Sequence, residues 1–327
     1  MNSKNILVTG GAGYIGSVLI GVLLQNGYHV RSFDNFSFGC DSLDRYKEHE
    51  NFENIQGDIT NVADCKNASK SIDTVIHLAA IVGDPACKLN SELAIAVNRV
   101  GAENILHTSL DNKVQRFIFA STCSNYGKMP DPNGFVDETT SLNPVSLYAE
   151  LKVEFEQKLL QLNESFFTPV CLRFATAYGL SPRIRLDLTV NEFTKELALG
   201  RKLEIYGEQF WRPYCHTTDI AQACLKSLEA ESSLVSHQAF NVGDTIENYQ
   251  KKTIIDLILK KLPEAKDNVV YIKKDDDPRD YRVNFDKIKN ILNFQIQKKV
   301  EDGISEFIGL IKSGNLVDPD SPTYKNI

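Results

Sequence analysis

The side chains with the clearest chemistry in this chain are Tyr148 and Lys152, four residues apart in a helical pattern over Leu147–Leu162. This spacing projects both side chains from one face of a helix. A nearby ammonium favours the phenolate form of a tyrosine, whose pKa is otherwise about 10, so Tyr148 could accept a proton from a hydroxyl. Thr122 follows a strand predicted over Arg116–Ala120 and could hydrogen-bond both the phenol and that hydroxyl. Because this tyrosine–lysine spacing also occurs by chance, the predicted catalytic triad of Thr122, Tyr148 and Lys152 depends on its surroundings.

A glycine-rich turn near the start of the chain supplies those surroundings. The apolar run Ile6–Thr9 leads into Gly10, Gly13 and Gly16, and a helical pattern follows over Ser17–Leu24. Backbone N–H groups and the positive end of the helix dipole then point at the turn, where a pyrophosphate fits. Gly10 permits the tight turn, Gly13 the close approach of the backbone, and Gly16 the packing of helix on strand. The pattern predicts a dinucleotide site.

Asp34 indicates which dinucleotide binds. It follows a second apolar run, His29–Phe33, at the distance from the glycine turn expected of a ribose-binding carboxylate. A carboxylate accepts hydrogen bonds from both adenosine ribose hydroxyls and repels a 2′-phosphate, and the next residues, Asn35 and Phe36, offer no arginine to hold that phosphate. An aspartate can also simply end a strand. With the glycine turn in place, we predict NAD as the cofactor.

Strand-like and helical segments alternate over the first 180 residues, which predicts βαβ units and a parallel sheet covered on both faces. We expect an α/β fold with a doubly wound, Rossmann-type sheet: residues 1–180 would form the NAD-binding domain, with 214–245 returning to it, and residues 181–327 a smaller α/β substrate domain. The tail from Ser313 is expected to be loosely held. Predicted strands are Asn5–Thr9, His29–Phe33, Asn54–Gln56, Thr74–Leu78, Arg116–Ala120 and Pro169–Arg173, and further helices cover Ala94–Leu110 and, after a strand from Tyr214, the segment to Leu228.

Composition excludes several classes of function. The net charge of −7 does not favour nucleic acid or an anionic membrane. The seven cysteines form no C-x-x-C pair, which argues against a zinc site or a disulfide framework and is typical of a reducing cytoplasm. No apolar run approaches the roughly 20 residues that span a bilayer, and the first predicted strand leaves no room for a signal peptide. We therefore expect a cytoplasmic protein without membrane or nucleic-acid partners and without a metal site.

Several motifs together are similar to those of the NAD-dependent epimerase/dehydratase family, extended short-chain dehydrogenases/reductases that act on nucleotide sugars. The resemblance covers nearly the whole chain. It implies an NAD cofactor, a nucleotide-diphosphate sugar as substrate, and a homodimer in which the helices over Ala94–Leu110 and Leu147–Leu162 form a four-helix bundle with their mates. The motifs are TGGAGYIG at 9–16, Asp34, GDI at 57–59, HLAA at 77–80, Asn98, STCSNYG at 121–127, YAELK at 148–152, LRFATAYG at 172–179 and RPYCHTTD at 212–219.

The resemblance also implies site residues. On the cofactor side these are Gly10, Gly13, Tyr14, Ile15, Gly16, Asp34, Asn35, Asp58, Ile59, Leu78, Ala79, Ala80, Asn98, Tyr148 and Lys152. On the substrate side they are Cys123, Ser124, Thr176, Arg183, Arg185, Asn191, Arg212 and Arg279, with Arg212 and Arg279 expected to hold the diphosphate. Arg185 and Asp187 could instead form a local surface salt bridge. Cys123 is more typical of a buried small residue, and His216 of a structural one.

Departures from the family pattern narrow the reaction. Dehydratases of the family carry Thr-Asp-Glu where this chain has Thr122, Cys123 and Ser124, so dehydration is not expected. Galactose-type 4-epimerases carry Asn where this chain has Thr176, so the chain departs from their pattern as well. The segments at 181–193 and 277–283 resemble a bacterial subgroup that includes GDP-heptose 4-dehydrogenases.

The sequence thus predicts oxidation at carbon 4 of a nucleotide-linked sugar, by a 4-epimerase or a 4-dehydrogenase. A 4-ketoreductase using the same site is the alternative. A non-catalytic NAD-sensing protein is a remote one, because such proteins usually lose the tyrosine or the lysine.

Overall fold

A parallel sheet forms the centre of the molecule. The computed structural model describes residues 4–129, 131, 133–274 and 279–326, and in these residues the sheet has seven strands in the order β10-β6-β5-β4-β1-β2-β3. The chain order reverses between β1 and β4, and the carboxyl edge at such a reversal is where open α/β sheets bind ligands. The predicted α/β, doubly wound Rossmann-type fold is confirmed.

The strands of the central sheet are β1 (Asn5–Thr9), β2 (His29–Asp34), β3 (Phe52–Gln56), β4 (Thr74–His77), β5 (Arg116–Thr122), β6 (Thr168–Phe174) and β10 (Gln238–Val242). Two smaller sheets lie beyond it, one of β11 (Asn248–Gln250), β9 (Trp211–His216) and β7 (Thr176–Tyr178), the other of β12 (Val269–Ile272) and β8 (Leu203–Tyr206). β7 pairs in parallel with β9 and begins two residues after β6 ends, so it carries the chain from the central sheet into the second lobe.

The helices are α1 (Gly16–Gln25), α2 (Val62–Ala68), α3 (Asp84–Leu89), α4 (Ser91–Ile95), α5 (Ala102–Asp111), α6 (Leu147–Leu160), α7 (Thr189–Ala198), α8 (Thr217–Glu229), α9 (Ser232–Val235), α10 (Lys251–Lys261), α11 (Asp286–Leu292) and α12 (Val300–Lys312). Short helical turns are η1 (Asp41–Tyr46), η3 (Cys123–Tyr126), η4 (Thr245–Glu247), η5 (Pro263–Asn268) and η6 (Pro322–Tyr324), and η2 (Ala96–Gly101) is π-helical.

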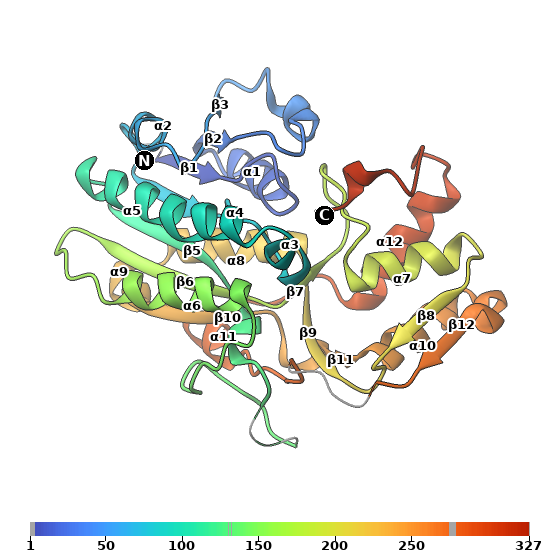
Figure 1. Ribbon diagram of the computed structural model, residues 1–327. Helices are drawn as coiled ribbons and strands as arrows, with labels where there is room; N and C mark the ends of the chain where they lie inside the picture. The colour runs from blue at the N-terminus through green and yellow to red at the C-terminus, as the bar shows by residue number, and fades with distance from the viewer. Residues whose placement is uncertain (1–3, 130, 132, 275–278, 327) are drawn as a thin grey trace.

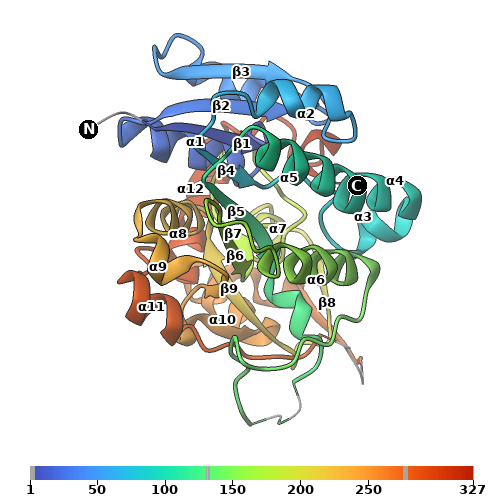
Figure 2. The same cartoon turned by 90° about the vertical axis from the view of Figure 1, so that its left-hand side faces the viewer.

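Two apolar cores cover the two faces of the central sheet. Leu19 and Leu23 of α1 pack with Ile220 and Cys224 of α8 on one face. Residues of α2, α5 and α6 pack around Phe117 on the other, and Figure 2 shows these helices on opposite sides of the strands. Burial of both faces explains why β5 and β6 read as continuous apolar runs.

A second lobe holds β8, β12, α7, α10 and α12 around its own core, and it stands apart from the central sheet on the right of Figure 1. The later chain also returns to the first lobe: β10 pairs with β6, and Phe285, Ile288 and Leu292 around α11 pack in the core beside α1 and α8. No helix in the described part of the chain has the length and apolarity that crossing a bilayer requires.

The helix expected over Ala94–Leu110 is present: α4, the π-helical η2 and α5 follow one another without a gap, and the π-turn inserts an extra residue into the helical ladder. One local prediction was wrong. The tail expected to be loose is anchored: Leu186 donates its N–H to the carbonyl of Tyr324 at 2.8 Å, and Arg201 makes a two-bond ion pair with Asp320 at 2.7 and 2.8 Å. Proline-rich composition indicated a mobile end, but these contacts to distant residues hold it.

Candidate active site

The predicted triad comes together at the carboxyl edge of the central sheet. Thr122 ends β5, and Tyr148 and Lys152 lie in the first turns of α6, which Ser146 caps by accepting the N–H of Ala149. A side-chain hydrogen bond joins Thr122 to the phenol of Tyr148. The Nζ of Lys152 lies 6.0 Å from the centroid of the Tyr148 ring and donates to the carbonyl of Ala120 at 2.8 Å.

Burial governs the protonation of the two titratable groups. It raises the pKa of Tyr148, as do the charges of Cys87 and Asp84, whereas the Thr122 hydrogen bond and the charge of Arg185 lower it by less. Burial lowers the pKa of Lys152 to about 8, so the ammonium form still dominates at pH 7. The phenol is therefore neutral in the protein alone, and its action as a base requires further positive charge beside it.

The glycine turn has the shape that a bound dinucleotide requires. Gly10 has a φ of +71°, and a Cβ on it would lie 2.8 Å from the backbone nitrogen of Ala79. A Cβ on Gly16 would collide with the carbonyl of Gly10. Side chains at these two positions would collide with the backbone at the end of β4 and with the turn itself, so the tight turn that the predicted dinucleotide site needs requires glycine at both.

The predicted adenosine end lies next to that turn. Asp34 accepts the N–H of Ala12 at 3.1 Å and that of Phe36 at 2.8 Å. Burial raises the pKa of Asp34, and these two hydrogen bonds oppose the rise. Asn35 donates to Asp58 at 3.3 Å, which brings two more predicted cofactor residues together. Ile59 is 6% exposed and lies against Gly101.

The end of β4 forms the opposite wall. Ala79 donates its N–H to the hydroxyl of Thr9 at 3.2 Å, and Leu78 and Ala80 flank it. Asn98, in the π-helical segment, exchanges two hydrogen bonds of 2.8 Å with the backbone of Ile81. The structure thus gives Asn98 the task of holding this wall in place.

The predicted substrate residues are distributed over the facing lobe. Arg279 pairs with Asp84 of α3 at 2.7 Å, and Arg212 stacks on Tyr281 with its guanidinium carbon 5.3 Å from the ring centroid. Residues 277 and 278 of the segment 277–283 lie outside the described part of the chain. Thr176 begins β7 and is partly exposed. These residues lie on segments that follow or face the triad.

The side chains of Cys123 and Ser124, which follow Thr122 in the chain, point to different surroundings. The thiol of Cys123 is 1% exposed and donates to the carbonyl of Arg173 at 3.2 Å, and burial raises its pKa. This placement supports the interpretation of Cys123 as a buried small residue. Ser124 is partly exposed and accepts a hydrogen bond from Tyr281 at 3.5 Å.

The other predicted substrate residues are Arg183 and Arg185 in the loop between β7 and α7, and Asn191 in the first turn of α7. Arg185 forms a two-bond ion pair with Asp187 at 2.9 and 2.7 Å, but the side chains are only 11% and 13% exposed, so the pair is not a surface one. Asn191 is fully buried: it donates to Tyr14 and to the carbonyl of Arg185, and accepts the N–H of Gly179. Its amide joins the loop to the glycine turn.

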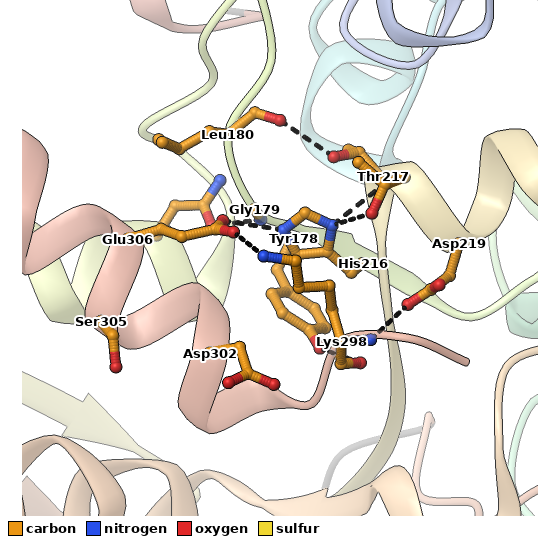
Figure 3. Close-up of polar contacts among 12 residues, drawn as sticks. Tyr178, Gly179, Leu180, His216, Thr217, Asp219, Lys298, Asp302, Ser305 and Glu306 are labelled. Atoms are coloured by element: carbon orange, nitrogen blue, oxygen red, sulfur yellow. Dashed lines mark hydrogen bonds and ion pairs between the residues drawn. The ribbon is translucent and has the colours of Figure 1, made fainter. Parts of the chain in front are cut away.

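His216 supports the same loop from below (Figure 3). Its imidazole, 2% exposed, bonds to Thr218 at 2.7 Å and to Glu306 of α12 at 2.9 Å. Tyr178 packs edge-on at 5.3 Å, and Gly179 lies so close that any Cβ on it would collide with the imidazole. These contacts agree with the predicted structural role of His216.

Sequence reasoning missed Asp84, Tyr281 and Phe38. Asp84 lies at the start of α3 and bonds to Ser146 and Arg279, and Tyr281 lies between Arg212 and Ser124. The DPRDYRV segment signalled Tyr281, whereas nothing local distinguishes Asp84 or Phe38 from ordinary surface residues. In the described residues, no group of three His, Cys, Asp or Glu side chains is arranged to hold a metal ion.

Comparisons with known proteins identify a family and several relatives. The model of a family described as "NAD dependent epimerase/dehydratase family" matches residues 6–243. The UDP-glucuronate 4-epimerase of Thermodesulfobacterium geofontis is 29% identical, over 94% of this chain and 98% of its own. The solved UDP-glucose 4-epimerase of Thermotoga maritima, with UDP-glucose, has a TM-score of 0.84 and 25% identity, covering 95% of this chain and all of that one. The UDP-N-acetylglucosamine 4-epimerase of Methanobrevibacter ruminantium has a TM-score of 0.82 and 26% identity, covering 96% and 99%.

Proposed function

Because the chain belongs to the NAD-dependent epimerase/dehydratase family, we propose that it is a nucleotide-sugar 4-epimerase acting through Thr122, Tyr148 and Lys152. It is an enzyme whose cofactor is NAD, as the family description states. The observation that carries the proposal is the convergence of the triad with the glycine turn at one edge of the sheet. Fold alone would not assign the reaction, whereas these side chains have defined roles in it.

Each triad residue has a defined role in the proposed reaction. Thr122, bonded to the phenol, orients the hydroxyl on carbon 4 of the sugar. Tyr148 in its phenolate form takes the proton of that hydroxyl and returns it when the carbonyl is reduced again. Lys152 keeps a positive charge beside the phenol and holds the cofactor ribose. NAD, when bound, would supply the acceptor and then the donor of the hydride at carbon 4.

The neighbours of Thr122 argue against dehydration. Removal of water across carbons 5 and 6 requires an acid and a base beyond the triad. Here Cys123 is buried with its thiol bonded to a backbone carbonyl, and Ser124 has only a hydroxyl to offer. Neither is a carboxyl group, so loss of water is not part of the proposed reaction.

Two arginines, Arg212 and Arg279, could bind the diphosphate of the nucleotide sugar. A guanidinium gives two parallel N–H donors to a phosphate. Arg279 is paired with Asp84 in the protein alone, at 2.7 Å, and Arg212 donates to the carbonyl of Trp211 at 2.7 Å. We propose that both turn to the substrate diphosphate when it binds, with Asp84 as the resting partner of Arg279.

Product analysis tests the proposal. The purified chain is scanned near 340 nm, then incubated with UDP-, GDP-, CDP- and dTDP-sugars, and products are followed by mass spectrometry and by chromatography that separates epimers. Tightly bound NAD with an isobaric epimer is the expected result. A ketone two mass units lighter, formed only with a keto acceptor, would instead indicate a 4-dehydrogenase.

Two other outcomes would also replace the proposal. Consumption of a supplied 4-keto sugar with NADH, without epimerisation, would indicate a 4-ketoreductase. NAD binding with no turnover of any sugar in the panel would favour an NAD-sensing protein.

We further propose a homodimer and a cytoplasmic setting. A hollow on α6 is lined by Val153, Glu154 and Leu162 among others, and Glu154 pairs with Arg99, the neighbour of the exposed Val100, where the four-helix bundle is expected. The seven cysteines are free thiols, as in a reducing compartment.

A further inference from the structure

Hydrogen bonds of the neighbouring Ser181 hold the backbone of Arg183 next to the predicted cofactor site. The hydroxyl of Ser181 donates to the carbonyl of Tyr14 at 2.6 Å, lies 3.1 Å from the hydroxyl of Ser17, and accepts the N–H of Arg183 at 3.2 Å. One serine thus ties this arginine both to the glycine turn and to the first turn of α1.

The guanidinium lies beside the residues expected to hold the adenosine ribose. Its central carbon is 4.2 Å from the ring centroid of Phe38, four residues after Asp34. The charges of Asp34 and Arg183 act on each other: the arginine lowers the pKa of the carboxyl, and the carboxyl raises the pKa of the arginine. Both observations place the positive charge of Arg183 at the predicted adenosine end of the cofactor site.

The charge of Arg183 is incompletely satisfied. The residue is 7% exposed, and its two terminal nitrogens donate to neutral oxygens, the Asn326 side chain at 2.6 Å and the Lys325 carbonyl at 3.0 Å. Its Nε is buried and has no hydrogen-bond partner among the described residues. Burial, with the nearby charge of Arg185, lowers the pKa of Arg183 to about 10. A buried guanidinium that is bonded only to neutral oxygens is stabilised when an anionic ligand binds beside it.

We propose that Arg183 binds the phosphate and ribose groups in the adenosine half of NAD, and that the tail segment 320–326 holds it in position. The residues 10–16 of the glycine turn include no basic side chain, so Arg183 would supply positive charge to the diphosphate from the opposite side. This differs from the sequence expectation, which placed Arg183 in the sugar pocket.

The tail segment runs along the Arg183 loop. Tyr324 accepts the N–H of Leu186, and the N–H of Asn326 donates to Asp187 at 3.2 Å. Tyr324 also packs against the apolar cluster that contains Leu186 and Phe307. Figure 1 shows the end of the chain between the two lobes, where the tail can set the position of a residue in the cleft.

The test measures binding of ADP-ribose, which contains the adenosine half and the diphosphate but no nicotinamide. The full chain, freed of cofactor, is titrated calorimetrically with ADP-ribose and NAD. Arg183→Gln is expected to weaken ADP-ribose binding about 10- to 100-fold, the effect of losing a hydrogen-bonded charge. Arg183→Lys, which keeps the charge, should lose less. Arg31→Gln is the matched control, since Arg31 bonds to Glu53 and to the carbonyls of Ala68 and Lys70 in the first lobe, and should stay within about threefold.

Asn326→Ala tests the role of the tail. It should weaken ADP-ribose binding in the natural chain and cause no further loss in the Arg183→Gln background, because the two residues act through one contact. Independent, additive losses would refute the positioning role.

Unchanged ADP-ribose affinity in Arg183→Gln, with weaker nucleotide-sugar binding to the NAD-loaded enzyme, would overturn the proposal and return Arg183 to the sugar pocket. If Arg183→Gln fails to fold by circular dichroism, the comparison of Arg183→Lys with Arg31→Lys decides instead. The inference rests on the NAD dependence of the family and not on the proposed 4-epimerisation, so inactivity towards every sugar would leave these affinities interpretable.

Discussion

Tyr148, the partly buried tyrosine of the triad, and Tyr126, a buried tyrosine in η3, should respond in opposite ways to loss of the hydroxyl. Tyr148 is bonded to Thr122 and is the proposed base. Tyr126 accepts a hydrogen bond from Arg173 at 2.8 Å and donates to Asn241 at 2.8 Å. Replacement by phenylalanine removes one oxygen in each case and leaves the ring packing intact.

For Tyr148→Phe, the loss of general base catalysis predicts a fall in kcat of about 10²- to 10⁴-fold. The change in stability is small, because one hydrogen bond to Thr122 contributes about 1 kcal/mol and burial of the phenol is unfavourable in itself. For Tyr126→Phe, the buried Arg173 and Asn241 each lose a partner, so unfolding should require about 2–4 kcal/mol less while kcat stays within a few-fold.

The assay combines epimer formation with the preferred nucleotide sugar, NAD binding by calorimetry, and urea unfolding of each variant. Tyr148→Phe should bind NAD within a few-fold of the natural chain. A Tyr148→Phe enzyme that keeps more than about a tenth of its turnover would refute the role of the phenol as base. A Tyr126→Phe enzyme as inactive as Tyr148→Phe would show that the loss reflects general damage to the site.

Three further predictions concern stability and assembly. Glu156→Gln, which leaves its buried arginine partner without a counter-charge, should lower the free energy of unfolding by about 3–5 kcal/mol, measured in urea; a loss below about 1 kcal/mol would contradict the importance of the pair. Burial opposes the charge of Glu306, but hydrogen bonds from His216 and Lys298 lower its pKa to about 2 (Figure 3), so its stabilising contribution is present above the unfolded pKa of about 4.5 and is lost as pH falls towards 2. After allowance for solvent screening this is about 2 kcal/mol, and unfolding of Glu306→Gln should show a flatter acid slope than that of the natural chain. In sedimentation velocity the 36.7 kDa chain should run as a dimer and Val100→Glu should shift it towards monomer, whereas a natural chain that is monomeric would exclude the proposed bundle.

Local patterns predicted most of the central sheet. β1 coincides with its predicted residues, and α6 begins at its predicted residue, because alternation, apolar runs and a serine cap act over a few neighbouring residues. The π-helical η2 escaped prediction, since a π-turn has no distinct spacing of apolar residues. The proline-containing tail was expected to be loose because its anchors, such as Leu186 and Arg201, lie more than a hundred residues away.

The sequence by itself determined the cofactor turn and the two helical members of the triad. Gly10, Gly13 and Gly16, like Tyr148 and Lys152, interact within a single turn or helix face, so spacing alone encodes their geometry.

Only the tertiary structure decided the direction of the remaining side chains. It turned the thiol of Cys123 into the core, paired Arg279 with Asp84 across 195 positions of sequence, and placed Arg183 beside Asp34. The first arrangement follows from the pairing of β5 with β6, and the other two from how the two lobes pack against each other; such long-range contacts leave no periodic trace in the residues that make them.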